Sequence, residues 1–454
     1  MKTAIVSSDT SLVTKADLIL SPGANMRFDS DEIVDQFGSL TSLEQDLLTL
    51  AVAVFSCDLA FPREERENFV RAIDLTVPVI NYQAFERFKP SLIYILWTLT
   101  HDSWKLTFEQ AQGDPEGKTY WPENSGRTLL FSGGLDSFAG AVDFLNKLGP
   151  KKLLLASHLT ANRVTRESQD SLFEHMTKKF GKLNRIRLKT RLQNTDKFSF
   201  PTDDNREETQ RARSFLFLTI GAIASRRSGF SEIVALAENG QMAIHLPLTA
   251  ARIGGFSTHT AHPSFISLSE KYFSELMQFP FTIRNPYLYA TKAEVVKELV
   301  INHADGIPLS SSCWRGVRVT DATIRHCGQC VPCLVRRISL EANGLELPEF
   351  ARDILREDIA KLKSDDDGKR NLVDLAEFAY RFTHESDAQI LDTYPDLVSS
   401  NIDFDMAVGM YRRFAAEANA ILQNYPAAAK VLTRISRPTK QRPKTTSKQN
   451  KSGN

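Results

Sequence analysis

Short apolar runs alternate with longer amphipathic stretches through the middle of this chain. A short apolar run bounded by turn-forming residues is typical of a buried strand, whereas apolar residues spaced three and four apart indicate a helix. The strands expected on this basis are 128–131, 152–157, 185–189 and 233–236, and the helices between them are 138–148, 165–180 and 207–226. Such alternation predicts an α/β fold, in which a parallel sheet is covered by helices on both faces.

The pattern defines further units on either side of this sheet. Residues 1–113 are expected to form an α+β accessory domain, and residues 114–126, rich in turn formers, a linker. The α/β domain covers 127–343, a helical extension 344–429, and a disordered basic tail 430–454. Further expected elements are a helix at 43–59, strands at 75–80, 92–99 and 104–108, and helices at 350–363, 372–382 and 405–422.

A glycine turn follows the first strand of the α/β domain directly. Its sequence is Ser132-Gly133-Gly134-Leu135-Asp136-Ser137, and a helix begins after it. The glycines let successive N–H groups point inward, the serines add hydroxyl donors, and the positive end of the helix dipole faces the same point. An isolated Ser-Gly-Gly is usually a surface turn, but the strand–turn–helix setting favours an anion site, with Asp136 placed to hold Mg²⁺.

Four of the five cysteines lie in one short segment. Cys327, Cys330 and Cys333 have overlapping CxxC spacing, Cys313 lies upstream, and Cys57 stands alone. Four soft ligands suit one tetrahedral ion, for which zinc is favoured and an iron–sulfur cluster is the alternative. A Cys₄ zinc site has no open coordination position, so we expect a structural role for it.

Composition and charge limit the classes of partner. The chain has 454 residues, a formal net charge of +1 and an ordinary content of apolar and charged residues. No apolar segment approaches the ~20 residues that span a bilayer, and no signal-like start is seen, so we expect a cytoplasmic protein without a membrane anchor. Nucleic-acid binding is indicated only weakly, because the basic tail is either an arm for an acidic partner or a solvated terminus.

The SGGxDS turn lacks the GxxxxGK(S/T) pattern and resembles the PP-loop of the ATP pyrophosphatase superfamily. With Ser312-Cys313, the cysteine triplet and Arg336-Arg337, the region 127–343 resembles 7-cyano-7-deazaguanine synthase, the QueC family. The resemblance implies an adenine nucleotide alpha hydrolase-like domain that uses ATP and Mg²⁺ and carries structural Zn²⁺. It also implies adenylation of the carboxylate of 7-carboxy-7-deazaguanine, followed by transfer to ammonia and formation of the nitrile.

The resemblance also assigns roles to individual residues. The residues expected to bind the nucleotide and Mg²⁺ are Ser132, Gly133, Gly134, Leu135, Asp136, Ser137, Arg213, Glu238 and Asn239. The expected catalytic residues are Asp136, Ser137, Lys292 and Arg211. Arg211 and Arg213 could reach the triphosphate or simply start a helix, and Lys292 could neutralise pyrophosphate or follow a surface N-cap at Thr291.

The chain departs from the biosynthetic family in its substrate segment. Residues 238–249 and 254–263 replace the family's pattern, and His259 and His262 are expected to structure this loop or to line an acceptor site. The long spacing from Cys313 to Cys327 and the extra terminal units are similar to the longer QueC-like proteins of bacterial anti-phage islands, such as the QueC-like component of the Qat defence system. That likeness implies that a partner-protein amine could replace ammonia.

Two other functions compete with this hypothesis. One is a PP-loop enzyme that modifies tRNA or transfers sulfur, in which the cysteines relay sulfur or hold an iron–sulfur cluster. The other is a nucleotide-sensing scaffold of a defence complex. Retention of Asp136 and both loop serines favours catalysis over a degenerate site.

Overall fold

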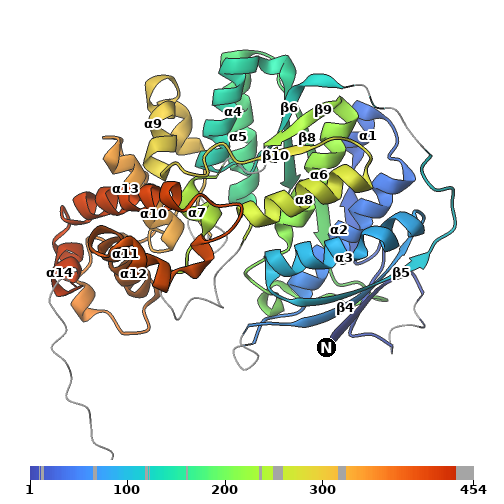
Figure 1. Ribbon diagram of the computed structural model, residues 1–454, viewed down its shortest axis with the longest axis horizontal. Helices are drawn as coiled ribbons and strands as arrows, with labels where there is room; N and C mark the ends of the chain where they lie inside the picture. The colour runs from blue at the N-terminus through green and yellow to red at the C-terminus, as the bar shows by residue number, and fades with distance from the viewer. Residues whose placement is uncertain are drawn as a thin grey trace, which may run out of the picture.

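The computed structural model describes residues 1–9, 11, 15–64, 69–117, 121, 123–159, 162–234, 238–248, 259–314 and 324–435. Two sheets and a group of helices make up the fold, and Figure 1 shows the first sheet (blue) below the second (cyan to green). Most of the expected tail, 436–454, and the segment 249–258 fall outside the described residues.

The first sheet is built from the N-terminal residues and has four strands in the order β2-β1-β4-β5. Its strands are β1 (Lys2–Val6), β2 (Leu18–Leu20), β4 (Ala72–Val79) and β5 (Ser103–Gln110). All three strand pairings are parallel. The expectation of an α+β domain is therefore wrong, because all neighbours in this sheet are parallel, and α-helices lie in the connections from β2 to β4 and from β4 to β5. The expected strands 75–80 and 104–108 are confirmed as β4 and β5.

The helices of the N-terminal unit are α1 (Asp31–Phe37), α2 (Ser42–Ala60) and α3 (Tyr82–Thr100). The expected helix 43–59 is confirmed as α2, whereas the expected strand 92–99 lies inside α3. Residues 92, 95, 96 and 99 are buried, while Tyr94 and Trp97 are 53% and 49% exposed. That spacing is the period of an amphipathic helix, so the apolar run belongs to one helix face rather than to a strand.

The second sheet has six strands in the order β10-β9-β6-β7-β8-β3. Its strands are β3 (Met26–Asp29), β6 (Asn124–Leu130), β7 (Leu153–Leu159), β8 (Asn184–Leu192), β9 (Phe230–Val234) and β10 (Thr282–Arg284). Five are parallel, and β3 pairs antiparallel with β8. The expected parallel strands are present, with the last of them described only as far as Val234 because residues 235–237 lie outside the described part of the chain. The N-terminal strand β3 forms one edge of the sheet.

Both faces of the second sheet are buried. Leu129 and Leu155 belong to the core that contains α4 (Leu135–Leu148) and α5 (Arg163–Phe180). The neighbouring Leu130 and Leu154 belong to the opposite core, with α6 (Arg213–Ser228) and α8 (Pro263–Leu276). This second core continues through α2 into the first sheet, so the N-terminal unit and the α/β unit share one hydrophobic interior.

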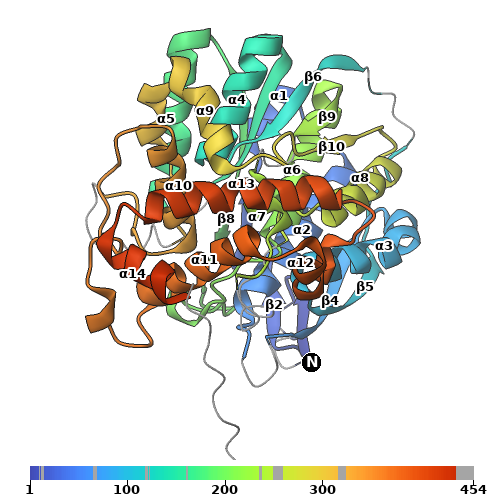
Figure 2. The same ribbon diagram turned by 60° about the vertical axis from the view of Figure 1, so that its left-hand side comes forward.

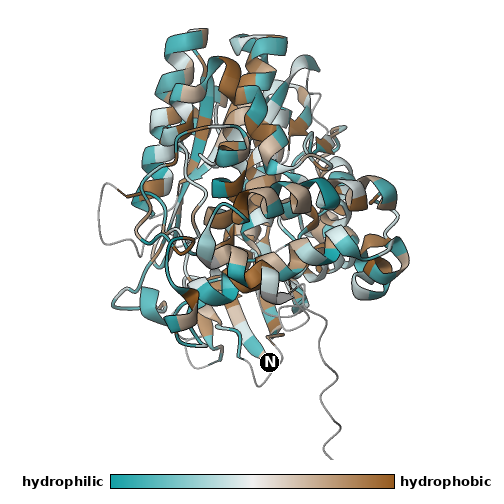
Figure 3. Cartoon of the chain, turned by 90° about the vertical axis from the view of Figure 1, so that its left-hand side faces the viewer, coloured by the Kyte–Doolittle hydropathy of each residue, from teal (hydrophilic) through white to brown (hydrophobic). Residues whose placement is uncertain are grey.

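A group of helices packs beside the second sheet around its own core. The helices of this group are α7 (Gly240–Ile244), α10 (Val331–Ala342), α11 (Asp367–His384), α12 (Asp387–Thr393), α13 (Phe404–Leu422) and α14 (Pro426–Ile435). Helix α9 (Lys292–Asn302) instead packs into the core that contains α4 and α5. Figure 2 shows α10, α11, α13 and α14 grouped together, and Figure 3 shows apolar and polar residues mixed along each helix of this face. No helix in the described part of the chain is long and apolar enough to cross a membrane.

Two of the three helices expected in the extension are confirmed within α11 and α13, and the third, 350–363, is wrong. Phe350 instead forms a β-bridge with His326, and a 3₁₀ turn, Ile359–Lys361, is the helical piece there. Ala351 N donates to the His326 carbonyl at 3.0 Å. The start of this segment forms backbone hydrogen bonds with residues near the cysteines, and these bonds replace the i to i−4 hydrogen bonds of a helix.

Candidate functional site

The glycine turn connects the end of β6 to the start of α4 as the sequence predicts. Gly134 is the N-cap residue of α4, so the helix begins at Leu135, earlier than expected. Gly133 has a φ of 78°, and a Cβ there would lie 2.9 Å from the backbone nitrogen of Gln169. The backbone angle and this close approach both require glycine at position 133.

The two serines of the turn close it from within. Ser132 Oγ lies 3.2 Å from Ser137 Oγ and accepts a hydrogen bond from Gly134 N at 3.2 Å. Ser137 Oγ donates to the Gly134 carbonyl at 3.0 Å. The turn is also held from outside, because Gln169 Nε2 donates to the Ser132 carbonyl at 3.4 Å and Ser311 N donates to the Gly133 carbonyl at 3.1 Å. The hydroxyl groups and the first N–H groups of α4 therefore face a fixed position.

Asp136 connects the turn to two distant segments. Its Oδ2 lies 2.5 Å from Lys292 Nζ and accepts from Asn239 Nδ2 at 3.2 Å. Lys292 is the first residue of α9, and Thr291 caps that helix in a capping box with Glu294. The N-cap at Thr291 is therefore confirmed, although Thr291 is buried rather than on the surface, and the capped helix start directs Lys292 to Asp136. The role of Lys292 toward pyrophosphate stays a prediction.

Glu238 adds a second carboxylate to this cluster. Burial, reinforced by the charge of Asp136, raises the pKa of Glu238 to about 7, although Lys292 and Arg213 oppose the rise. Glu238 Oε2 and Asp136 Oδ1 are buried, and within the described residues neither has a hydrogen-bond partner. Asn285 fixes the backbone of Glu238, because its Nδ2 donates to the Glu238 carbonyl at 2.7 Å. Two unpartnered carboxylate oxygens in one charge cluster fit a hard divalent cation such as Mg²⁺.

Arg213 and Arg211, both expected to contact the triphosphate, lie in different parts of the structure. Arg213 begins α6, and its guanidinium lies over the ring of Phe217. Burial lowers the pKa of Arg213, and the charge of Glu238 counteracts this. Arg213 therefore belongs to the cluster of Glu238.

Arg211 lies elsewhere, which corrects the expectation that it reaches the nucleotide. Its Nη1 donates to the Thr100 carbonyl at 3.1 Å. Burial and the charge of Arg63 lower the pKa of Arg211 to about 10. The reason is that α6 starts later than expected: the residues before Arg213 form a turn, and Ala212 N donates to Asp58 Oδ2 of the N-terminal unit at 2.8 Å.

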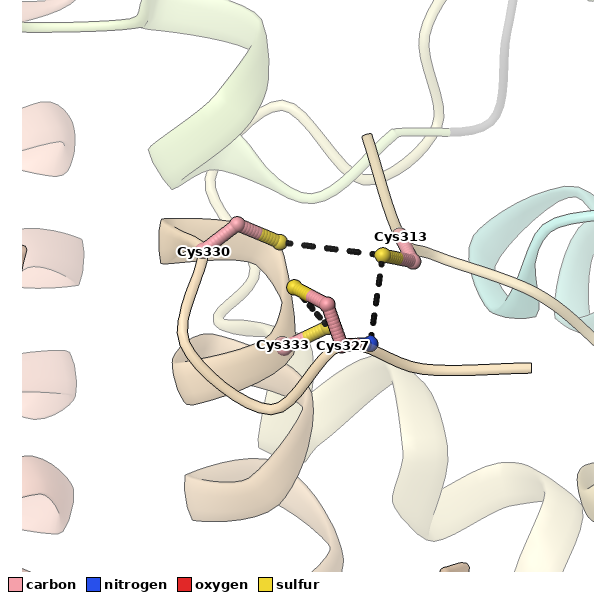
Figure 4. Close-up of side chains that lie close together, drawn as sticks. All are labelled: Cys313, Cys327, Cys330 and Cys333. Atoms are coloured by element: carbon pink, nitrogen blue, oxygen red, sulfur yellow. Dashed lines mark hydrogen bonds between the residues drawn. The ribbon is translucent and has the colours of Figure 1, made fainter. Parts of the chain in front are cut away.

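The four cysteines expected to bind a metal lie together, as Figure 4 shows. All of their Sγ atoms are within 4.8 Å of one another. Cys313 Sγ is 4.0 Å from Cys330 Sγ, and Cys327 Sγ is 3.9 Å from Cys333 Sγ. Four thiolates at ~2.3 Å from a tetrahedral zinc ion are about 3.8 Å apart, so the spacing fits one such ion. A cluster of several irons and sulfides needs more room between its ligands.

Glycine also shapes the turn between these cysteines. Gly328 has a φ of 76°, and a Cβ there would lie 1.9 Å from the carbonyl oxygen of Arg352. Cys330 is the N-cap residue of α10, and Cys333 lies in the first turn of that helix. The positive end of α10 therefore favours thiolates at two of the four positions.

A buried arginine links the cysteine cluster to the glycine turn. Arg336 on α10 is fully buried, and its guanidinium donates to Ser310 Oγ at 2.9 Å and to the Ile307 carbonyl at 2.9 Å. Ser311, the next residue, holds Gly133 through its backbone. Sequence reasoning missed these roles of Arg336 and Ser311, although the Arg336-Arg337 pair after the cysteine triplet was a signal for them.

The histidines of the loop lie close together but away from the cysteines. The rings of His259 and His262 are 4.9 Å apart, and His101 lies 4.7 Å from His259. His262 caps α8, because its Nδ1 accepts from Ser264 N at 3.3 Å. Burial lowers the pKa of His259 to about 2 and that of His262 to about 4. His262 is therefore a neutral residue that structures its loop.

Comparison with known families and proteins adds no assignment, since no family model matches the chain and no curated protein matches it significantly. What the chain could do must be argued from the geometry of the turn, the charge cluster beside it and the cysteines.

Proposed function

We propose that this protein is an AMP-forming C–N ligase of the QueC-like type, which adenylates a 7-deazaguanine carboxylate and transfers it to an amine. The observation that supports this most directly is the convergence of Asp136, Lys292, Glu238 and Asn239 at the Ser-Gly-Gly turn. A bare anion-binding turn needs only N–H and hydroxyl donors. Carboxylates with unpartnered oxygens and a buried lysine suit a metal-bound polyphosphate instead.

Each group of the cluster has a chemical task in this proposal. The turn and the start of α4 hold phosphate oxygens with N–H and hydroxyl donors. Asp136 and Glu238 hold Mg²⁺, which would neutralise charge on the triphosphate. Lys292 and Arg213 stabilise the negative charge that develops on the departing pyrophosphate. The four cysteines hold structural Zn²⁺. The zinc site fixes α10, and Arg336 of α10 holds the segment that contacts the glycine turn.

The reaction follows from this arrangement. A carboxylate oxygen of the acid attacks the α-phosphorus of ATP, a new O–P bond forms, and the bond to the bridging oxygen of pyrophosphate breaks. An amine then attacks the acyl carbon and AMP leaves. Burial of Glu238, Asp136 and Lys292 strengthens each charge interaction with the phosphates, because little water competes.

Exchange of labelled pyrophosphate into ATP tests the first step. We expect exchange that depends on 7-carboxy-7-deazaguanine and Mg²⁺. Exchange with a different acid would keep the adenylation chemistry and discard this substrate. If no acid supports exchange, the proposal is refuted.

The second step has two candidate nucleophiles, ammonia and an amine of a partner protein in a defence operon. Mass spectrometry of products and of the partner distinguishes them.

The alternative of sulfur transfer makes a different prediction for the metal. A relay cysteine must be free to carry sulfur, and an iron–sulfur cluster brings iron and sulfide. The mutual distances of the four Sγ atoms favour one tetrahedral ion in which all four thiolates are occupied. Metal analysis that finds one zinc per chain supports the ligase, and iron with labile sulfide supports the alternative.

The proposed ligase would act in the cytoplasm, where free ATP is available.

A further inference from the structure

Strand β5 forms one edge of the first sheet. It stands at the end of the strand order, and in the described part of the chain it pairs with β4 alone. Figure 1 shows β5 at the margin of this sheet, with α3 above it. An edge strand of eight residues presents a row of backbone groups to which another strand can pair.

The hydrogen bonds to β4 determine which backbone groups of β5 point outward. Ser103 N donates to the Arg71 carbonyl at 2.8 Å, and Ala111 N, just past the strand, donates to the Val79 carbonyl at 2.9 Å. Alternate residues of a parallel strand bond the same neighbour, so the odd-numbered residues of β5 bond β4. The outward N–H and C=O groups belong to the even-numbered residues, which are Trp104, Leu106, Phe108 and Gln110.

These outward groups restrict how a second copy of β5 could pair. In an antiparallel pair about a two-fold axis, only residues with outward groups exchange hydrogen bonds, so even-numbered residues must lie opposite even-numbered residues. A pairing centred on Thr107 satisfies this rule, because it places Leu106 opposite Phe108 and the reverse. Thr107 then faces Thr107 of the second copy, and Lys105 faces Glu109.

The charges on β5 favour this centre over the alternatives. Lys105 and Glu109 are exposed, on the face opposite to Phe108, whose ring packs on Phe85 of α3 at 5.4 Å. The pairing centred on Thr107 places each charge opposite its complement, once on either side of the axis. Centres on Lys105 or Glu109 would place like charges opposite each other, which is destabilising. Centres on Leu106 or Phe108 would place both charges opposite uncharged residues.

Exposed aromatic side chains lie next to this edge. The rings of Tyr94 and Trp97 on α3 stack with centroids 5.7 Å apart, and both side chains are about half exposed. With Ser103 and Trp104 of β5 they line an open groove of about 390 Å³. The two-fold axis of an antiparallel pair is perpendicular to the sheet, so α3 of both copies lies on one face. The second copy would therefore bury apolar surface that a single chain exposes.

We propose that β5 is the contact surface of a homodimer, in which the β5 strands of two copies pair antiparallel about Thr107 and join the two first sheets. A lysine on an edge strand usually prevents such pairing, but here Lys105 has a complementary Glu109 in the second copy. The inference goes beyond the proposed adenylation and does not depend on it.

Size exclusion with light scattering over a range of concentrations tests the dimer. The wild type is expected to show the mass of two chains and to dissociate on dilution. Glu109→Lys should weaken association at least about tenfold, because like charges then face each other on both sides of the axis. Lys105→Glu should do the same, although it also removes an ion pair with Asp74, and the double exchange should restore association. Lys2→Glu, on the inner strand β1, is the matched control and should associate as the wild type.

A cysteine at the centre of the pairing tests the register. Opposite residues that share no hydrogen bond have Cα atoms about 4.5 Å apart, which is close enough for a disulfide. Thr107→Cys should therefore form a covalent dimer with oxidised glutathione. Ser103→Cys, at the end of the same face, should not, and the wild type controls for the native cysteines.

A wild type that stays monomeric at every concentration overturns the proposal. A dimer that Glu109→Lys leaves unchanged, or that the double charge exchange fails to restore, uses another surface and also overturns it. Failure of Thr107→Cys to cross-link a wild-type-like dimer overturns the register. Melting temperatures like that of the wild type show that each variant is folded.

Discussion

Lys292 Nζ lies 2.5 Å from Asp136 Oδ2, and this ion pair joins the first turns of α9 and α4. Two helix N-termini and a lysine bring positive potential to one point, and Asp136 is the acidic group that directly contacts the lysine there. Under the proposed function, a bound polyphosphate would compete with Asp136 for Lys292, and Asp136 would bind the metal instead.

The first prediction concerns Asp136. Asp136→Asn keeps the shape of the side chain but removes the negative charge that, in the proposed function, would hold Mg²⁺. Pyrophosphate exchange should fall roughly 100-fold or more. Asp143→Asn, which removes an ion pair with Lys147 further along the same helix, should leave exchange intact. A variant that loses exchange but keeps the protein's biological function would instead favour the nucleotide-sensing scaffold.

Lys292 and its cap can be separated by a pair of variants. Lys292→Met should lower kcat, because the proposed function assigns to this lysine the stabilisation of charge on departing pyrophosphate. Thr291→Ala removes the N-cap hydroxyl and should cost about 1 kcal/mol of stability, with a much smaller effect on kcat. Urea unfolding and steady-state kinetics on both proteins check the split. Equal loss of kcat in both variants would contradict the assignment of Lys292.

Arg213 and Arg211 form the second matched pair, because they are two positions apart but face different parts of the molecule. Arg213→Met should raise the KM for ATP, since Arg213 belongs to the cluster of Glu238. Arg211→Met should lower the melting temperature instead, because it removes the bond to the Thr100 carbonyl. Kinetics and thermal unfolding of both variants test this. The assignment fails if Arg211→Met affects the KM for ATP more than Arg213→Met does.

Glu238 gives the site a predicted pH dependence. Its pKa is raised from an ordinary 4.5 to about 7, so between these values the folded protein binds more protons than the unfolded chain. The contribution of Glu238 to stability is therefore fully present below about pH 4.5 and is lost as the pH rises to about 7. Glu238→Gln should remove this part of the pH dependence, as measured by urea unfolding at pH 5 and pH 8.

The same ionisation should govern metal binding. In the proposed function the carboxylate form of Glu238 would hold Mg²⁺, so the apparent affinity for Mg²⁺ should increase as the pH rises through about 7. Titration of exchange activity with Mg²⁺ at several pH values measures this, and Glu238→Gln should flatten the response. A pH response that persists in Glu238→Gln belongs to another group.

Loss of the metal bound by the cysteines should also disturb the glycine turn. Cys330→Ser is expected to lower the zinc content and also pyrophosphate exchange, because α10 positions Arg336, and Arg336 holds the segment that contacts Gly133. Cys57→Ser, at the cysteine buried in α2, should leave zinc content unchanged. Exchange at the wild-type rate in zinc-free protein would show that the two sites are independent.

Local patterns in the sequence were enough to predict several features of this protein. The strand, the glycines and the helix start around Gly133 are consecutive in the chain, and the CxxC spacing brings Cys327, Cys330 and Cys333 together at the start of α10. The alternation of strands and helices predicted a buried parallel sheet. These features depend on interactions between near neighbours, which periodicity and turn chemistry describe.

The tertiary structure determined which residues from distant segments contact one another. It placed Lys292 and Asn239 on Asp136, sent Arg211 to the N-terminal unit, and added β3 to the edge of the second sheet. It also brought α7, α10, α11 and α13 together around one hydrophobic core. Such contacts depend on where whole elements pack. That packing is set by burial of complementary surfaces across the chain, and no short stretch of sequence records it.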